Sequence, residues 1–270
     1  MISYSPSNTA NEAWLRAIYE VFLYGRTVVP RGKKTRELQH RLVSVDMSYP
    51  VVTIPDRKLS YPFMAAEAYW ILSGDDTVSG IAPYNKQIAA FSDDGETFFG
   101  AYGPPIAKQL NYVVETLIHD RDSRQAGLTI WRPNPPKTKD MPCTVSIFAM
   151  IRQDALHLHV FMRSSDIWLG LPYDVFNFSM LGHLICSAYN IDVPEARQIR
   201  VGTLYLTAAS QHLYEINFDS ASGLHYELPP SPPVPYDASH SPSFLLKLLK
   251  DLRETIPGDP LRWWEGAVPS

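Results

Sequence analysis

The stretch VSIFAMIRQDALHLHVFM, residues 145–162, contains two runs in which apolar and polar side chains alternate. Such a period of two is typical of strands that bury one face. The polar residues 152–155 separate the two runs, so the pattern predicts a β-hairpin. The segments 141–144 and 163–174, which flank this hairpin, hold the side chains best suited to chemistry, and we interpret them together.

Elements of both kinds are expected on either side of the hairpin. Helical spacing and apolar runs indicate helices at 13–23, 63–72, 105–118, 176–189 and 244–254. A strand followed by a turn is expected at 42–54, and further strands at 128–131 and 199–206, with a mobile loop at 25–36 and a proline-rich surface excursion at 228–243. We find no internal repeat and no linker, so the sequence predicts a single α+β domain over residues 1–270.

The composition limits the class of protein. Of the 270 residues, 45% are hydrophobic and 19% are charged, which is typical of a globular protein with a sizeable core. A net charge of −4 argues against a dedicated nucleic-acid binder. No apolar run approaches the roughly 20 residues of a membrane helix, and the polar N-terminus lacks a signal-peptide pattern. We therefore expect a cytoplasmic protein.

A cysteine and an arginine–serine pair stand at the two ends of the hairpin. Cys143 follows a proline, and a thiolate there would be a strong nucleophile whose pKa nearby arginines would lower. A small buried side chain is the alternative for any free cysteine, and it is our interpretation of Cys186. Arg163 and Ser164 suit a phosphate, because a guanidinium and a hydroxyl both donate hydrogen bonds to anions.

Further candidates lie outside the hairpin. Arg26 and Arg124 could add anion contacts, or they are simply solvated charges. Glu67 interrupts an apolar segment, so it is either a buried acid whose raised pKa suits proton transfer or a helix-edge residue facing water. His212 and Tyr214 lie in a polar segment that follows a strand, where they could hydrogen-bond a sugar hydroxyl.

The sequence does not predict a metal site. His157 and His159 alternate along one strand, and no cysteine or acid stands near them at metal-ligand spacing, so we interpret both as strand side chains. A glycine-rich phosphate loop is also absent from the sequence.

Taken in order, these segments resemble the thymidylate synthase superfamily. The matching blocks are Gly25-Arg26-Thr27, Glu67 ahead of Ser73-Gly74-Asp75, Tyr102-Gly103, Asp122-Ser123-Arg124, Pro142-Cys143, Arg163-Ser164-x-Asp166-x-x-Leu169-Gly170-x-Pro172 and His212-x-Tyr214. They span most of the chain, although the region after residue 228 matches weakly.

The resemblance implies a fold and an activity. The implied fold is a large twisted mixed sheet packed by helices, with two such sheets back to back in a homodimer. The implied reaction moves a one-carbon unit from 5,10-methylenetetrahydrofolate to C5 of a pyrimidine nucleotide monophosphate. It implies neither a metal nor a membrane or nucleic-acid partner.

The resemblance also implies a role for each matching residue. Cys143 would attack C6 of the ring and make C5 nucleophilic, and Glu67 would manage protons through ordered water. The nucleotide would be held by Arg26, Tyr102, Arg163, Ser164, His212 and Tyr214, with Arg124 reaching into the partner's phosphate site. The folate would face Asp166, Leu169 and Gly170.

One departure from the family concerns the base. The asparagine that reads uracil in thymidylate synthases is Asp174 here. A carboxylate accepts from the N4 amino group of cytosine, and a protonated carboxyl or a protonated N3 completes the second hydrogen bond. Facing uracil, it would leave a buried acceptor against O4. Asp174 thus resembles the deoxycytidylate and cytidylate hydroxymethylases, unless it merely caps the helix that follows.

Other departures concern the reaction and the phosphate. Residues 85–92 lack the tryptophans that shield the exocyclic methylene intermediate in thymidylate synthases, so water is expected to reach it and give a hydroxymethyl product. Gln125 replaces a second arginine of the family's cross-dimer phosphate clamp. The tail at 266–270 loosely resembles the C-terminus that closes over folate in the family.

The sequence thus predicts a cytidylate 5-hydroxymethylase that prefers dCMP to CMP. The alternatives are a CMP-specific hydroxymethylase of nucleoside antibiotic biosynthesis, a (d)CMP 5-methyltransferase and a thymidylate synthase. A non-catalytic nucleotide- or RNA-binding relative is a further alternative, but such a protein would not need the thiol of Cys143.

Overall fold

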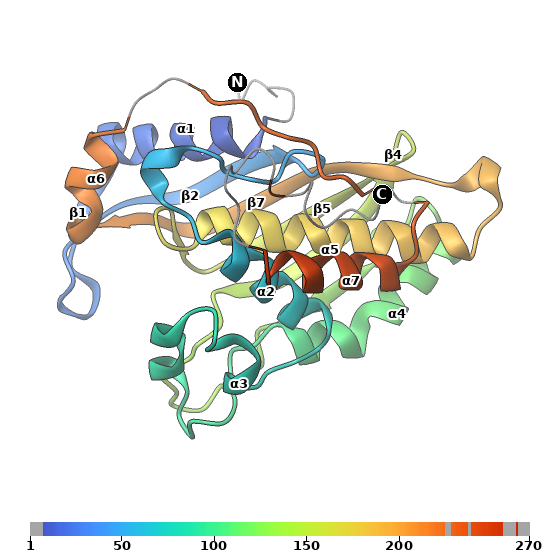
Figure 1. Cartoon of the computed structure of the whole chain (residues 1–270), viewed down its shortest axis with the longest axis horizontal. Coiled ribbons are helices and arrows are strands. Elements are labelled where there is room, and N and C mark those ends of the chain that lie inside the picture. The colour runs from blue at the N-terminus through green and yellow to red at the C-terminus, as the bar shows by residue number, and fades with distance from the viewer. Residues whose placement is uncertain (1–7, 225–227, 237–238, 256–262, 264–270) are drawn as a thin grey trace.

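A mixed sheet forms the centre of the protein, as a computed structural model that describes residues 8–224, 228–236, 239–255 and 263 shows (Figure 1). Its described strands are β1 (Arg26–Val28), β2 (Thr35–Asp46), β3 (Gly127–Thr129), β4 (Thr144–Arg152), β5 (Ala155–Met162), β6 (Ser165–Asp166) and β7 (Arg200–Tyr214). The helices are α1 (Ala10–Tyr24), α2 (Tyr61–Leu72), α3 (Val78–Ile81), α4 (Gly103–His119), α5 (Leu171–Ile191), α6 (Phe218–Ser222) and α7 (Pro242–Leu252). The mixed sheet packed by helices confirms the predicted fold class.

The strand order brings several chain segments to one end of the sheet. It runs β1-β2-β7-β5-β4-β3, with β6 paired to β7, and every pairing is antiparallel except β5–β7 and β6–β7. The predicted hairpin is β4–β5, whose turn residues Gln153 and Asp154 both have positive φ. Consequently the starts of β2 and β4 lie at the same end of the sheet as the last residues of β5 and β7.

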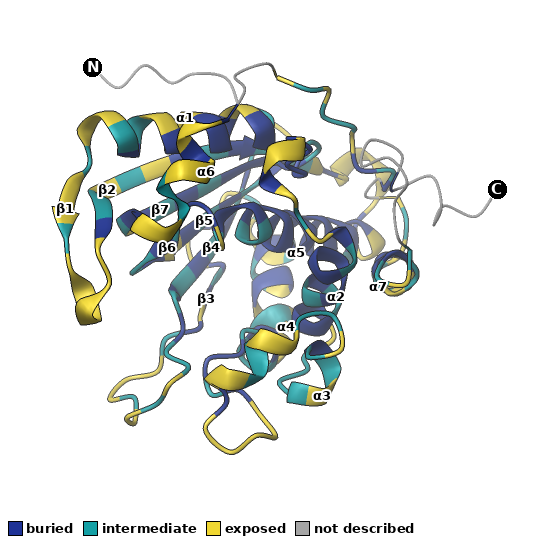
Figure 2. Ribbon diagram, turned by 60° about the vertical axis from the view of Figure 1, so that its left-hand side comes forward, coloured by how far each residue is buried: buried dark blue, intermediate teal, exposed yellow. Residues whose placement is uncertain are grey.

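The core lies between the sheet and its helices. Helices α1, α4 and α5 contact the strands, while α2 and α7 pack against α5 (Figure 1). Almost all of α5 is buried (Figure 2), because the sheet covers one side of the helix and α2 and α7 cover the other. This burial on all sides explains why the helix carries apolar residues around most of its circumference. None of the described helices is long and apolar enough to cross a bilayer.

Two expectations about local structure were wrong. The expected loop at 25–36 holds β1 and the start of β2, because these segments pair with each other along the sheet edge. The strand expected at 199–206 continues to Tyr214, because β2 pairs with β7 from Thr203 to Tyr214. The described part of the proline-rich segment lies mostly at the surface, as expected, although Val234 and Tyr236 are buried and pack on the core. The tail at 266–270 lies outside the described residues.

Candidate active site

A cavity of about 450 Å³ opens at the end of the sheet where these segments meet. It is lined by Pro30, Arg31, Thr35, Glu37, Trp131, Met141, Arg163, Ser164, Ser210, His212 and Tyr214. The pairing of Thr35 with Tyr214 and of Glu37 with His212 explains how β2 and β7 supply adjacent side chains to one wall. The structure therefore brings Arg163, Ser164, His212 and Tyr214 together around one cavity.

Cys143 lies beside this cavity, at the start of β4. The Arg163 backbone N–H donates to the Cys143 carbonyl at 2.9 Å, which joins the start of β4 to the end of β5. The Arg163 guanidinium also donates, from Nε to the Pro142 carbonyl at 2.9 Å and from Nη2 to the Met141 carbonyl at 2.8 Å. Arg163 thus holds the loop before the cysteine and still lines the cavity.

The expectation that arginines lower the pKa of Cys143 was wrong in its net direction. Arg163 and Arg31 do lower it, but burial of the thiol is the largest effect and raises the pKa above its usual value. Asp174 and Asp140 raise it further, because a neighbouring negative charge disfavours a thiolate. In the free chain the thiol is therefore held protonated.

Asp174 lies in the first turn of α5 and is not a capping residue. The helix begins at Leu171 with Gly170 as its N-cap, and no side chain accepts a capping hydrogen bond there. Burial raises the pKa of Asp174 well above its usual range, and the nearby Glu67 and Asp166 raise it further. Among the described residues, no side chain or backbone group hydrogen-bonds its carboxyl. The structure thus rejects the capping alternative.

Glu67 projects from α2 toward α5. Its Oε2 accepts a hydrogen bond of 2.8 Å from Asn177 Nδ2, one helical turn beyond Asp174. Burial raises the pKa of Glu67 from 4.5 to about 7, although this hydrogen bond opposes the shift. The structure therefore rejects the alternative of a solvated helix-edge residue.

Tyr102 lies close to both Asp174 and Cys143. Its hydroxyl accepts from the Thr144 backbone N–H at 3.3 Å, and its ring stacks on Phe178 of α5 at 6.2 Å between centroids. Burial raises its pKa well above the usual value, and the charges of Asp174 and Cys143 add to that shift. The phenol is thus neutral and lies close to both of these side chains.

Asp166 and its neighbours border the same region. Asp166 Oδ1 accepts from the backbone N–H groups of Trp168 and Leu169, each at 2.9 Å. Its partner across the β6–β7 pairing is His212, whose Nδ1 is buried without a hydrogen-bond partner. Leu169 is 54% exposed.

Gly170 leaves space between Asp166 and Asp174, because it has no side chain. A Cβ added to Gly170 would lie 3.3 Å from Asp174 Oδ2 and from the Asp166 carbonyl oxygen, so any larger residue would press on both acids.

Two predicted residues are not brought into the site of the single chain. Arg26 is exposed on β1 and does not line the cavity, where Arg31 of the same basic loop stands instead. Arg124 is exposed in the turn before β3, near the Arg152 end of β4. Nine residues of extended strand separate that end from Cys143, a span of about 30 Å.

Sequence reasoning missed Arg31, Trp131 and Asn177. The basic composition of the loop could have suggested Arg31, whereas no local pattern distinguishes Trp131 or Asn177. Within the described parts of the chain, no three His, Cys, Asp or Glu side chains gather in a way that would hold a metal ion.

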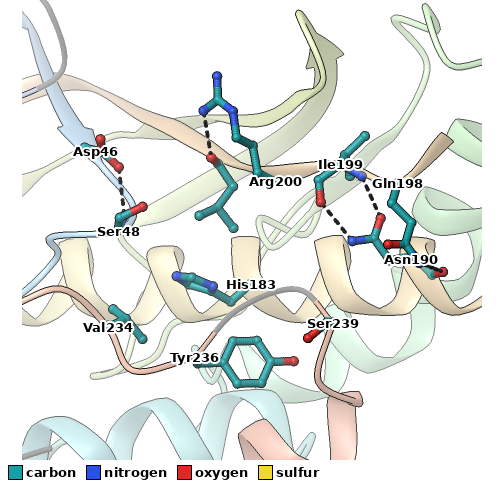
Figure 3. A pocket seen from close by; sticks show the side chains of 11 residues that line it. Asp46, Ser48, His183, Asn190, Gln198, Ile199, Arg200, Val234, Tyr236 and Ser239 are labelled. Carbon is teal, nitrogen blue, oxygen red and sulfur yellow. Dashed lines mark hydrogen bonds between the residues drawn. The ribbon is translucent and has the colours of Figure 1, made fainter. Parts of the chain in front are cut away.

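A second cavity, of about 350 Å³, lies at the opposite end of β7, where α5 meets the segment 228–236 (Figure 3). His183 and Tyr236 face each other there, and Asn190 exchanges hydrogen bonds of 2.8 Å with the backbone of Ile199 (Figure 3). Burial lowers the pKa of His183 to about 4, so its ring is neutral at physiological pH. This cavity lies away from Cys143 and the acids around it.

The shifted pKa of Glu67 predicts a pH dependence of stability. The folded protein holds this proton more tightly than the unfolded chain, whose pKa is 4.5. The contribution of Glu67 to the free energy of unfolding is therefore complete below pH 4.5 and is lost as the pH rises to about 7. We expect urea titrations of wild type and Glu67→Gln to diverge across that window by about 3 kcal/mol. The exposed Glu115→Gln is the control, and equal pH dependence in all three proteins would contradict the prediction.

Comparison with known proteins identifies the family to which this fold and site belong. The thymidylate synthase family model matches residues 12–235, and the chain therefore belongs to that family, as the resemblance predicted. Among its relatives is a deoxyuridylate hydroxymethyltransferase of Bacillus phage SP01, 27% identical over 226 residues, which cover 75% of this chain and 56% of that protein. A second, of Delftia phage PhiW-14, is 30% identical over 169 residues, which cover 54% and 47%.

A thymidylate synthase of Buchnera aphidicola subsp. Baizongia pistaciae is 24% identical over 194 residues, which cover 67% of this chain and 70% of that protein. The chain spans about half the length of the two phage relatives.

Proposed function

We propose that this chain transfers a one-carbon unit from 5,10-methylenetetrahydrofolate to C5 of a cytidine monophosphate nucleotide, dCMP in preference to CMP. Water would complete the reaction and give the 5-hydroxymethyl nucleotide. The observation that carries this proposal is the partly buried Asp174 carboxyl, which has no hydrogen-bond partner in the described chain and lies beside Cys143 and Tyr102.

Asp174 suits cytosine because a buried carboxyl must find a ligand partner to offset its desolvation. Protonated, as its raised pKa favours, it donates to N3 of cytosine and accepts from the N4 amino group. The phage relatives are named for deoxyuridylate, so they support hydroxymethyl transfer to a pyrimidine nucleotide without indicating which base this chain selects.

The remaining cavity residues suit the rest of the nucleotide. Arg31, Arg163 and Ser164 offer cationic and hydroxyl donors to a 5′-phosphate. Arg26 keeps its predicted part only if β1 moves, and Arg31, in the turn between β1 and β2, is the better placed of the two. His212 and Tyr214, whose rings meet edge to face at 5.0 Å, would hydrogen-bond the sugar.

Cys143 would start the reaction by attacking C6 of the bound pyrimidine, which makes C5 nucleophilic. The thiol must first lose a proton, and burial opposes that loss in the free chain. A carboxyl whose pKa is about 7, such as that of Glu67, exchanges protons readily at physiological pH and would serve the proton transfers through ordered water.

The folate side of the site fits a flat heterocycle with N–H groups. Asp166 uses Oδ1 for two backbone N–H groups, which leaves Oδ2 as an acceptor, and the exposed Leu169 beside it offers an apolar contact. We propose that Asp166, Leu169 and Gly170 hold the folate. When bound there, 5,10-methylenetetrahydrofolate supplies the one-carbon unit.

Access of water to the site would favour a hydroxymethyl product over a methyl product. The segment in which thymidylate synthases carry shielding tryptophans forms a 3₁₀ helix, η3 (Lys86–Phe91), in which no residue is buried. Phe91, its only aromatic residue, is 55% exposed. If another group shields the site, the alternative is a (d)CMP 5-methyltransferase.

One experiment separates the base, the sugar and the reaction. Purified protein is incubated with 5,10-methylenetetrahydrofolate and, separately, with dCMP, CMP, dUMP or UMP, and the products are analysed by mass spectrometry. We expect 5-hydroxymethyl-dCMP as the main product, which is heavier than the methyl product by one oxygen atom. Turnover of dUMP without turnover of dCMP or CMP would refute the proposed base.

We further propose that residues 1–270 form one catalytic domain that works as a homodimer. The sheet face away from the helices leaves Leu42 50% and Phe161 45% exposed, and both pair with Thr207 in adjacent strands. Two such faces packed back to back would bury this apolar strip. In one chain strand β4, about 30 Å long, separates its Arg152 end, near Arg124, from Cys143, which is consistent with Arg124 serving the phosphate of the partner.

Hybrid dimers test this arrangement. We expect Arg124→Ala and Cys143→Ala to be weakly active or inactive when each is made alone. Co-expressed, they should regain about a quarter of wild-type activity, because half of the dimers are hybrids and each hybrid has one complete site. Hybrids that are shown to form by affinity tags and yet stay inactive would contradict a phosphate contact across the dimer.

A further inference from the structure

Asn177 places an unused acceptor beside the two carboxyls. The residue is 5% exposed, and its Oδ1 is buried without any hydrogen-bond partner. Its Nδ2 donates to Glu67 Oε2 at 2.8 Å. An orphaned carbonyl oxygen at this depth costs stability in the free protein unless a ligand or an ordered water donates to it.

The geometry of α5 places Asn177 near Asp174. The two residues are three apart in the helix and therefore lie on the same face. Both also lie close to Glu67, Asn177 through its hydrogen bond and Asp174 through its charge. Asp174, Glu67 and Asn177 thus form one polar cluster.

A neutral Asp174 carboxyl does not by itself define the base. Turned one way it donates to N3 and accepts from N4–H of cytosine, and turned the other way it donates to O4 and accepts from N3–H of uracil. A neighbouring group that can only accept a hydrogen bond would remove this ambiguity. Asn177 is such a neighbour, because the hydrogen bond from Nδ2 to Glu67 leaves Oδ1 only the role of acceptor.

We propose that Asn177 is a second base-reading residue, whose Oδ1 accepts the second N–H of the cytosine 4-amino group, directly or through one ordered water. The 4-amino group carries two hydrogens, one for Asp174 and one for Asn177. The O4 atom of uracil would face the same oxygen as a second acceptor, so uracil is penalised at this point. This inference rests on the proposed cytosine specificity.

The test measures dissociation constants of dCMP and dUMP for the full chain by titration calorimetry. In wild type we expect dCMP to bind more tightly than dUMP. In Asn177→Ala this preference, the ratio of the two constants, should fall roughly tenfold, as expected when one base-reading acceptor is lost. Asn177→Ser, which keeps a small polar side chain, should show the same direction and serves if the alanine variant does not fold.

Asn190→Ala is a matched control. Asn190 is also buried on α5, where it hydrogen-bonds the Ile199 backbone far from Cys143. Its replacement should lower thermal stability and leave the nucleotide preference unchanged. A wild-type preference for dCMP that survives both Asn177 substitutions would overturn the inference and leave the proposed function standing. A wild type without preference for dCMP would refute the cytosine specificity and this inference together.

Discussion

Replacing Cys143 with alanine should lower product formation by roughly 10⁴-fold or more, while dCMP still binds with nearly wild-type affinity. The loss is large because no other described side chain beside the cavity is a comparable nucleophile at neutral pH. Binding should survive because the phosphate and sugar contacts come from other residues, among them Arg163 and His212. The measurements are single-turnover product formation and calorimetric titration with dCMP.

The second cysteine supplies the control for this prediction. Cys186 is fully buried in α5, and its Sγ donates to the Ile199 carbonyl at 3.2 Å. Cys186→Ala should cost on the order of 1 kcal/mol of stability and leave turnover within about twofold of wild type. Turnover by Cys143→Ala at a tenth of the wild-type rate or more would remove Cys143 from the nucleophilic role.

Replacing Asp174 with asparagine should shift specificity from cytosine to uracil nucleotides. An amide donates to O4 and accepts from N3–H of uracil, whereas in that same orientation its N–H faces the N4 amino group of cytosine and its oxygen faces N3. Mismatched buried hydrogen bonds discriminate strongly, so the ratio of kcat/KM for dCMP to that for dUMP should fall on the order of 10³-fold. Steady-state kinetics with both nucleotides measures this ratio.

Asp192→Asn is the matched control, because Asp192 is exposed at the other end of the same helix. It should leave the ratio unchanged. If Asp174→Asn keeps the wild-type selectivity for cytosine, Asp174 does not read the base, and a buried structural carboxyl becomes the better interpretation of its position.

Local patterns determined much of the fold. The alternation in 145–162 predicted the hairpin β4–β5, and helical spacing predicted α1, α2, α4, α5 and α7 within a few residues of their ends. These predictions succeed because strand and helix periods depend on neighbours along the chain. The ordered blocks around Cys143 and Arg163 likewise predicted the family and the meeting of these residues, since both flank one hairpin.

The tertiary structure alone decided the electrostatics and the long-range contacts of the site. The net rise in the pKa of Cys143, against two arginines, depends on how deeply the folded chain buries the thiol. The bond from Asn177 to Glu67 joins residues 110 positions apart, and Arg31 replaces Arg26 at the cavity only because of how β1 and β2 pair. Burial and contacts of this kind arise from the packing of distant segments, which no local pattern encodes.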